Sequence, residues 1–310
     1  MGNHAFARQI CDGTEPSPRP RLTIYAPSAE MTATANVAVP EFVPVEPEAA
    51  APPFRQLDPT PELMAELAAA SERLESAQPE EIIAWAHHRF APHLTMATAF
   101  GPEGCVILSM LAKVAPETYV FNLDTGYQFQ ETLELRDQIA RQYGIEVDML
   151  QPELTVAEYE AKHGGPLYKT NSTQCCFDRK VKVLRNAATK HHAWMSGIRR
   201  DQTAIRAQAK ILELQSDGLL KINPLLNWTK ADVKKYMEEK NLPSHPLYEK
   251  GYRSVGCAPC TIAIGVNDDE RAGRWAGRGK VECGLHTDMF KKKDIADVKQ
   301  EFHMDVTKVK

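Results

Sequence analysis

Short apolar runs alternate with longer amphipathic stretches through the middle of the chain. A run such as 94–99 is short, apolar and bounded by a glycine turn, which is typical of a buried strand. A first helix is predicted after Asp58-Pro59-Thr60-Pro61, where Leu63, Leu67, Ala70 and Leu74 recur at helical spacing behind a capping residue. The pattern predicts further helices over 79–90, 105–115, 129–143 and 175–189, and strands over 94–99, 118–123, 145–150 and 193–196.

This alternation of strands and helices predicts an α/β fold. Its expected core is a parallel twisted sheet with helices on both faces. Such sheets bind ligands in the crevice beyond the carboxyl ends of their strands. The loops after Ala99, Leu123 and Ser196 are therefore expected to share one site.

Both ends of the chain depart from this pattern. Residues 1–57 hold a dense scatter of prolines and no sustained apolar period, so we expect a disordered, Pro/Ala-rich extension there. Residues 291–310 form a charged, lysine-rich tail, to which we assign no chemistry.

Composition and charge exclude several classes of protein. With 310 residues, 43% of them hydrophobic, the chain can bury a sizeable core. A formal net charge of −4 lacks the basic excess of most nucleic-acid-binding proteins, so no nucleic-acid partner is expected. No apolar run is long enough to span a membrane and no secretory signal is visible, so we expect a cytoplasmic protein without a membrane partner.

Two close cysteine pairs are the strongest chemical signal. Cys175-Cys176 and Cys257-Ala258-Pro259-Cys260 can converge as four thiolates, which suits an iron–sulfur cluster or a structural zinc. The adjacent pair departs from the spacing of zinc knuckles but leaves zinc open. Four ordinary buried cysteines are the remaining alternative.

A single cysteine lies in the motif Glu282-Cys283-Gly284-Leu285-His286. The cationic residues Arg271, Arg274, Arg278 and Lys280 precede it, and positive charge favours the nucleophilic thiolate. Cys283 is thus either an idle thiol or a nucleophile carried on a lid.

Anion-binding features follow three predicted strands. Arg199 and Arg200 come after the strand at 193–196, where guanidinium groups can hold phosphate or sulfate oxygens. The glycine turns at 100–104 and 123–126 offer backbone amides to the same kind of ligand.

Together these motifs resemble the adenosine 5′-phosphosulfate (APS) reductases. That group belongs to the phosphoadenosine phosphosulfate (PAPS) reductase family and is related to the ATP pyrophosphatases. The resemblance covers roughly 60–290 and rests on the segments 98–104, 123–126, 131–132, 175–180, 197–202, 223–233, 256–261, 271–275 and 282–286.

The resemblance implies an adenine-nucleotide alpha-hydrolase-like fold with a C-terminal catalytic tail. Residues 58–265 would form the nucleotide-binding reductase domain with its iron–sulfur site, and 266–290 the segment with the catalytic cysteine. Cys283 would be the nucleophile, and a [4Fe-4S] cluster would be bound by Cys175, Cys176, Cys257 and Cys260. The implied substrate-binding residues are Lys180, Arg199, Arg200, Arg271, Arg274, Phe100, Gly101, Asp124, Gly126 and His286.

The implied enzyme is an oxidoreductase of sulfur groups with a disulfide acceptor. It would reduce APS to sulfite and AMP in assimilatory sulfate reduction, through an S-sulfocysteine on Cys283. A thioredoxin or similar dithiol protein would be the separate reductant. PAPS or dual specificity, an ATP-using tRNA sulfurtransferase and a zinc-stabilised binding module are the alternatives. The oligomeric state stays open, with a homo-oligomer as one alternative.

Overall fold

The computed structural model describes residues 54–188, 190–215, 218–280 and 282–286, which belong to one unit that begins at Pro53. The expectations for 1–53 and for the charged tail 291–310, and residues 287–290 of the expected catalytic segment, lie outside this part. Residues 54–57 pack against the domain, because the ring of Phe54 lies 4.7 Å from those of His93 and His192.

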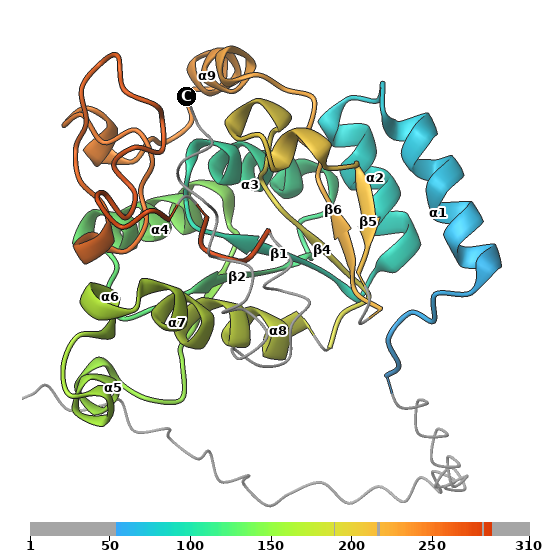
Figure 1. The fold of residues 1–310 in the computed structure, drawn as a ribbon. Coiled ribbons are helices and arrows are strands. Elements are labelled where there is room, and N and C mark those ends of the chain that lie inside the picture. Colours follow the sequence, from blue (N-terminus) through green and yellow to red (C-terminus); the bar gives the residue numbers. More distant parts are fainter. Residues whose placement is uncertain (1–53, 189, 216–217, 281, 287–310) are drawn as a thin grey trace, which may run out of the picture. The chain divides into compact units, whose positions relative to one another are not determined.

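The centre of the fold is a six-stranded sheet (Figure 1). Its strands are β1 (Leu94–Thr98), β2 (Tyr119–Leu123), β3 (Val147–Leu150), β4 (Ala193–Met195), β5 (Leu212–Leu214) and β6 (Leu220–Ile222). They lie in the order β3-β2-β1-β4-β6-β5, and every pair is parallel except β5 with β6. The predicted parallel sheet is therefore confirmed, with one antiparallel strand added at its edge.

Nine α-helices are found among the described residues, and capping side chains mark where several of them begin. They are α1 (Pro61–Leu74), α2 (Pro79–Phe90), α3 (Pro102–Val114), α4 (Gln130–Tyr143), α5 (Val156–His163), α6 (Leu167–Thr170), α7 (Ser172–Cys176), α8 (Lys182–Ala188) and α9 (Lys230–Glu239). The Thr60 hydroxyl caps α1 by accepting a hydrogen bond from the amide of Leu63 at 3.2 Å. The helix predicted over 175–189 is interrupted, because the π-helical turn Phe177–Val181 separates α7 from α8.

Alternating side chains along the strands divide the core between the two faces of the sheet. Met96, Val120 and Met195 belong to the cluster that α1, α2, α3, α4 and α9 cover. Phe121 and Trp194 belong to a second cluster, beneath the π-helical turn and α8. Figure 1 shows these two layers, with α2, α3 and α9 on one side and α7 and α8 on the other.

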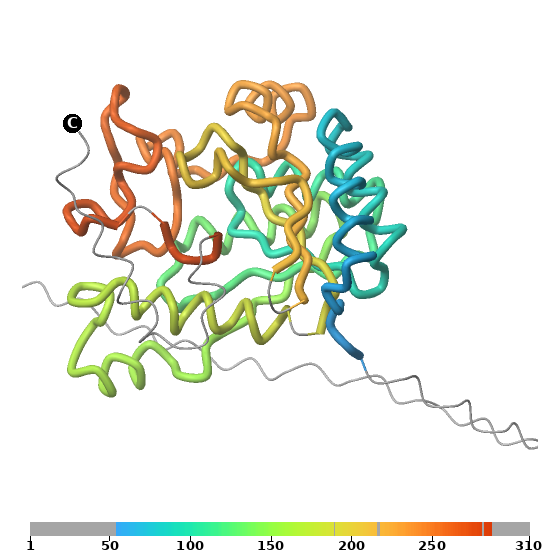
Figure 2. The backbone as a smooth tube through the Cα atoms, turned by 45° about the vertical axis from the view of Figure 1, so that its right-hand side comes forward, coloured from blue at the N-terminus to red at the C-terminus, as the bar shows by residue number. Residues whose placement is uncertain are grey.

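The described end of the chain returns to the middle of the domain. We call residues 266–280 and 282–286 the C-terminal segment. Leu285 packs against the cluster beneath α8, and Figure 2 shows the red end of the tube above the α7–α8 region. No helix among the described residues is both long and apolar enough to cross a membrane.

Candidate functional site

A cavity of about 230 Å³ opens at the carboxyl ends of the parallel strands. The loops after β1, β2 and β4 line it, as the strand order predicts for loops at this edge. The C-terminal segment closes one side of it. We call it the strand-end cavity. Seven of the predicted site residues line it, namely Gly101, Lys180, Cys257, Arg271, Arg274, Cys283 and His286.

The loop after β1 presents the N-terminus of α3 to this cavity. Phe100 adopts a positive φ of 55°, and its amide donates to the Thr98 hydroxyl at 3.1 Å. Gly104 lies so close to this hydroxyl that a Cβ atom would approach it to 2.7 Å. The ring of Phe100 is buried in the core instead of facing the cavity, so of this pair only Gly101 forms part of the wall.

The turn after β2 is held by its own polar groups. Asp124 accepts a hydrogen bond from the amide of Gly126 at 2.9 Å and another from Gln151 at 2.9 Å. Neither Asp124 nor Gly126 lines the cavity, where Thr125 and Gln128 lie instead. The two predicted residues thus shape the turn, and their neighbours form the wall.

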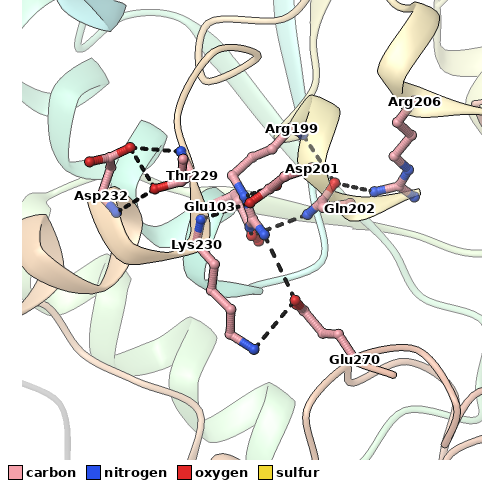
Figure 3. Close-up of polar contacts among 9 residues, drawn as sticks. All are labelled: Glu103, Arg199, Asp201, Gln202, Arg206, Thr229, Lys230, Asp232 and Glu270. Carbon is pink, nitrogen blue, oxygen red and sulfur yellow. Dashed lines mark hydrogen bonds and ion pairs between the residues drawn. The ribbon is translucent and has the colours of Figure 1, made fainter. Parts of the chain in front are cut away.

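The two adjacent arginines after β4 point in different directions. Arg199 is buried and forms ion pairs with Glu103, with Asp201 at 2.9 Å and with Glu270 at 3.8 Å (Figure 3). Arg200 instead pairs with Glu75, the residue directly after α1. Neither side chain lines the strand-end cavity, and the carboxylate partners offset both charges.

The four predicted ligand cysteines surround a second, smaller cavity. Cys175 and Cys176 end α7, while Cys257 and Cys260 come from the loop and short 3₁₀ turn at Ala258–Cys260. We call this space the cysteine cavity. Burial, followed by the charges of the other three thiols, raises the pKa of Cys175 to about 12. In the described part of the chain, no group of three or more His, Cys, Asp or Glu side chains is arranged to hold a metal ion.

The two cavities share a wall made of Thr125, Lys180, Cys257 and Arg274. Burial opposes the charged form of Lys180, but the Cys257 and Cys283 thiolates together raise the pKa of its ammonium group. Burial likewise opposes the Cys257 thiolate, yet Lys180 and the Thr125 hydroxyl lower the pKa of this thiol overall. Lys180 therefore acts electrostatically on both cavities.

Several polar atoms at the strand-end cavity have no hydrogen-bond partner among the described residues. They are Gln128 Oε1, Arg274 Nε and His286 Nδ1. Burial, aided by nearby Arg206, Lys221 and Arg271, lowers the pKa of His286 well below its usual value, so its ring is neutral. Buried polar atoms are costly to leave unpaired, so this wall is suited to a polar ligand.

Arg206 and Glu282 were missed as site residues by sequence reasoning. Arg206 lines the strand-end cavity and forms a buried ion pair with Glu282, which directly precedes Cys283. Glu282 lies in the recognised motif. Arg206 had only a weak signal in the sequence, its positive charge six positions after Arg200.

Comparison with known proteins identifies the family. The model of the phosphoadenosine phosphosulfate reductase domain matches residues 93–263. An adenosine 5′-phosphosulfate reductase of Salinibacter ruber is 44% identical over 223 residues, which are 71% of this chain and 88% of that protein. A phosphoadenosine 5′-phosphosulfate reductase of Gloeobacter violaceus is 41% identical over 216 residues, covering 68% of this chain and 90% of the relative.

A solved structure agrees with these sequence matches. The crystal structure of a PAPS reductase from Candida auris superposes with a TM-score of 0.59 at 30% identity, covering 67% of this chain and 100% of that one. The expected adenine-nucleotide alpha-hydrolase-like fold is thereby confirmed. By its sequence, its sheet and its strand-end cavity, the chain belongs to the phosphoadenosine phosphosulfate reductase domain family.

Proposed function

We propose that this protein reduces adenosine 5′-phosphosulfate to sulfite and AMP, using Cys283 as nucleophile and a thioredoxin-type dithiol protein as reductant. One observation carries the proposal: Cys283 lines the strand-end cavity together with Lys180, Arg271 and Arg274. A thiol among fixed cations suits attack on an anionic sulfur compound, because the cations offset the repulsion between thiolate and substrate.

The nucleotide would lie across the carboxyl ends of β1, β2 and β4. Backbone amides at the N-terminus of α3 would face its anionic part, since a helix N-terminus favours negative charge. Arg274 and Lys180 would bind phosphosulfate oxygens, as would Arg271. Asp124, Gly126 and the Phe100 ring support the walls of the cavity from outside.

The first chemical step is attack of the Cys283 thiolate on the substrate sulfur. A sulfur–sulfur bond forms, the bond from sulfur to the bridging phosphate oxygen breaks, and its electron pair leaves with AMP. The cysteine is left as an S-sulfonate, and no external oxidant or reductant is needed to this point.

The second step transfers the electron pair from a dithiol. One reductant thiolate attacks Cys283 Sγ, which releases sulfite with the electron pair of the broken sulfur–sulfur bond. The second reductant thiol then resolves the mixed disulfide, so that the reductant leaves as a disulfide and Cys283 is regenerated.

The cysteine cavity suits a resident [4Fe-4S] cluster by the number and kind of its donors, and the lack of a single-ion site among the described residues does not oppose this, because four thiolates around a cluster need not meet at one ion. Four thiols from two distant segments face one enclosed space, and thiolates are the usual ligands of such clusters. When bound, the cluster would add its own charge next to Lys180 and fix the two segments that carry its ligands. We place this reductase in the cytoplasm, where reducing conditions keep these cysteines from forming disulfides.

Reduction of the 3′-phosphorylated nucleotide, PAPS, is the second candidate function. The Gloeobacter violaceus relative named for that activity is nearly as similar as the relative named for APS. Both reactions would use the same thiol and cations, so only the ribose end of the nucleotide would be recognised differently.

Intact-protein mass spectrometry tests the proposal. Anaerobically purified protein is mixed with stoichiometric APS, or separately with PAPS, without any thiol. A gain of one sulfonate that maps to Cys283 is expected, and the nucleotide that produces it faster is the substrate. No gain with either nucleotide, from protein shown to contain its cluster, would overturn the proposed function.

A further inference from the structure

A buried ion pair holds the residue that precedes the proposed nucleophile. Arg206 Nε donates to Glu282 Oε1 at 3.0 Å and Arg206 Nη2 donates to Glu282 Oε2 at 2.9 Å, which makes the pair bidentate. Its members are 76 residues apart in the sequence, and both are buried, Glu282 with only 2% of its surface exposed. Bidentate guanidinium–carboxylate pairs fix direction as well as distance.

Two further groups contact the same carboxylate, one of them, Arg271, from the wall of the strand-end cavity. Arg271 Nη2 lies 3.3 Å from Glu282 Oε2, and the Thr203 hydroxyl lies 3.5 Å from Oε1. The guanidinium of Arg206 is itself oriented, because it donates to Gln202, which also accepts from the backbone amide of Arg199 (Figure 3). Glu282 therefore attaches the C-terminal segment to a network that begins in the loop after β4.

We propose that Glu282 is a positioning residue, which holds Cys283 at the strand-end cavity through its bidentate pair with Arg206. This inference rests on the proposed function. Misplacing a reacting atom by about 1 Å can cost roughly 100-fold in rate. A carboxylate one residue from the thiol, held at both oxygens, restricts the thiol to the position from which it reaches the substrate.

The experiment separates the rate of sulfonation from nucleotide binding. In Glu282→Gln the rate of Cys283 sulfonation at saturating nucleotide is expected to fall by roughly 10- to 100-fold. The dissociation constant for AMP, measured by calorimetry, is expected to change less than about threefold, because the main partner of Glu282 is Arg206 and its contact with Arg271, at 3.3 Å, is longer. The matched control is Glu66→Gln, which removes a carboxylate paired with Arg89 on the exposed surface.

Glu282→Asp distinguishes position from charge. Aspartate keeps the negative charge next to Arg206 but withdraws the carboxylate by one methylene, so the bidentate pair cannot form without moving Cys283. We expect a sulfonation rate well below wild type and faster amide hydrogen exchange in residues 282–286. A wild-type rate in Glu282→Asp would overturn the positioning role, since charge alone would then suffice.

A different outcome would make Glu282 a competitor of the substrate for Arg206 and Arg271. Glu282→Gln would then bind AMP more tightly with an unchanged sulfonation rate, and this too would overturn the positioning role. Failure of the wild-type protein to form any Cys283 adduct would count against the proposed function itself, so the two failures are distinguishable.

Discussion

Lys180 lies against the Cys257 thiol in the wall that separates the strand-end cavity from the cysteine cavity. A single ammonium group therefore faces one of the proposed cluster ligands and, across the wall, the proposed nucleophile Cys283. The charge of Lys180 therefore acts both on a proposed cluster ligand and on the proposed nucleophile.

Removing this charge is expected to impair both binding and sulfonation. Lys180→Met keeps the apolar stem but withdraws the cation that offsets repulsion between thiolate and substrate. We therefore expect sulfonation to be roughly 100- to 1,000-fold slower, which is the usual effect of losing one preorganised donor. Rapid-quench mass spectrometry measures it. Lys182→Met is the control, because the Lys182 side chain is 58% exposed and pairs with Asp178. Equal rates in the two variants would contradict the role of Lys180.

The cysteine cavity makes a prediction about metal content. Cys257→Ser replaces a thiolate by a poor iron ligand, so the purified protein is expected to lose its iron and its broad visible absorbance. Cys105→Ala is the matched control, because Cys105 is a buried core thiol in α3 whose pKa burial raises to about 12. Iron analysis by mass spectrometry of both proteins decides the matter. Zinc in place of iron in the wild-type protein would refute the proposed cluster.

The neighbours Arg199 and Arg200 are expected to differ sharply in stability effects. Arg199→Met leaves the mostly buried carboxylate of Glu103 without its cation, which costs about 3 kcal/mol of unfolding free energy. Arg200→Met breaks a partly exposed pair with Glu75, which costs about 1 kcal/mol or less. Urea unfolding monitors both. A large loss of AMP affinity in Arg200→Met would contradict its placement outside the cavity.

The His286 ring predicts a loss of stability in acid. Its pKa in the native protein is lowered well below 6.5 by burial and by the cations Arg206, Lys221 and Arg271, whereas the unfolded chain takes up a proton at the ordinary value. The unfolded state then binds more protons below about pH 6.5, so native stability falls as the pH decreases through this range.

Substitution of His286 by phenylalanine tests this sign. Phenylalanine keeps an aromatic ring against Trp194, whose ring lies 5.9 Å from that of His286, but it cannot be protonated. Melting temperatures measured between pH 7.5 and 5.5 should fall more steeply for the wild type than for His286→Phe. Parallel curves would show that His286 is not the responsible group.

Hydrophobic periodicity predicted four of the strands and most of the long helices that cover the sheet, because buried strands and long amphipathic helices leave strong patterns in the sequence. β5 and β6 were not predicted, since each is only three residues long and has a charged residue at its centre, unlike the equally short but wholly apolar β4. The interrupted helix was missed as well, because the backbone widens into a π-helical turn at Phe177–Val181 without a glycine or proline to mark it.

The candidate site could be predicted where it contains rare, chemically distinctive side chains. It could not be predicted where the direction of a side chain determines whether the residue lines the cavity. The paired cysteines and Cys283 are rare side chains in recognisable motifs, and the structure brings them to two adjoining cavities. Sequence could not show that neither Arg199 nor Arg200 lines the strand-end cavity. Nor could it show that Arg206 meets Glu282, because a pairing across 76 residues depends on the complete fold.

The order of the cavity walls along the chain also has a consequence for biosynthesis. The loops after β1, β2 and β4 and the Cys257 loop all precede Cys283 in the sequence, so the ribosome makes the proposed reactive thiol after them. Domains generally begin to fold while later residues are still being added. The thiol would thus be made after the sheet and Lys180, whereas Arg271 and Arg274, only 12 and 9 residues before it, would leave the ribosome together with it.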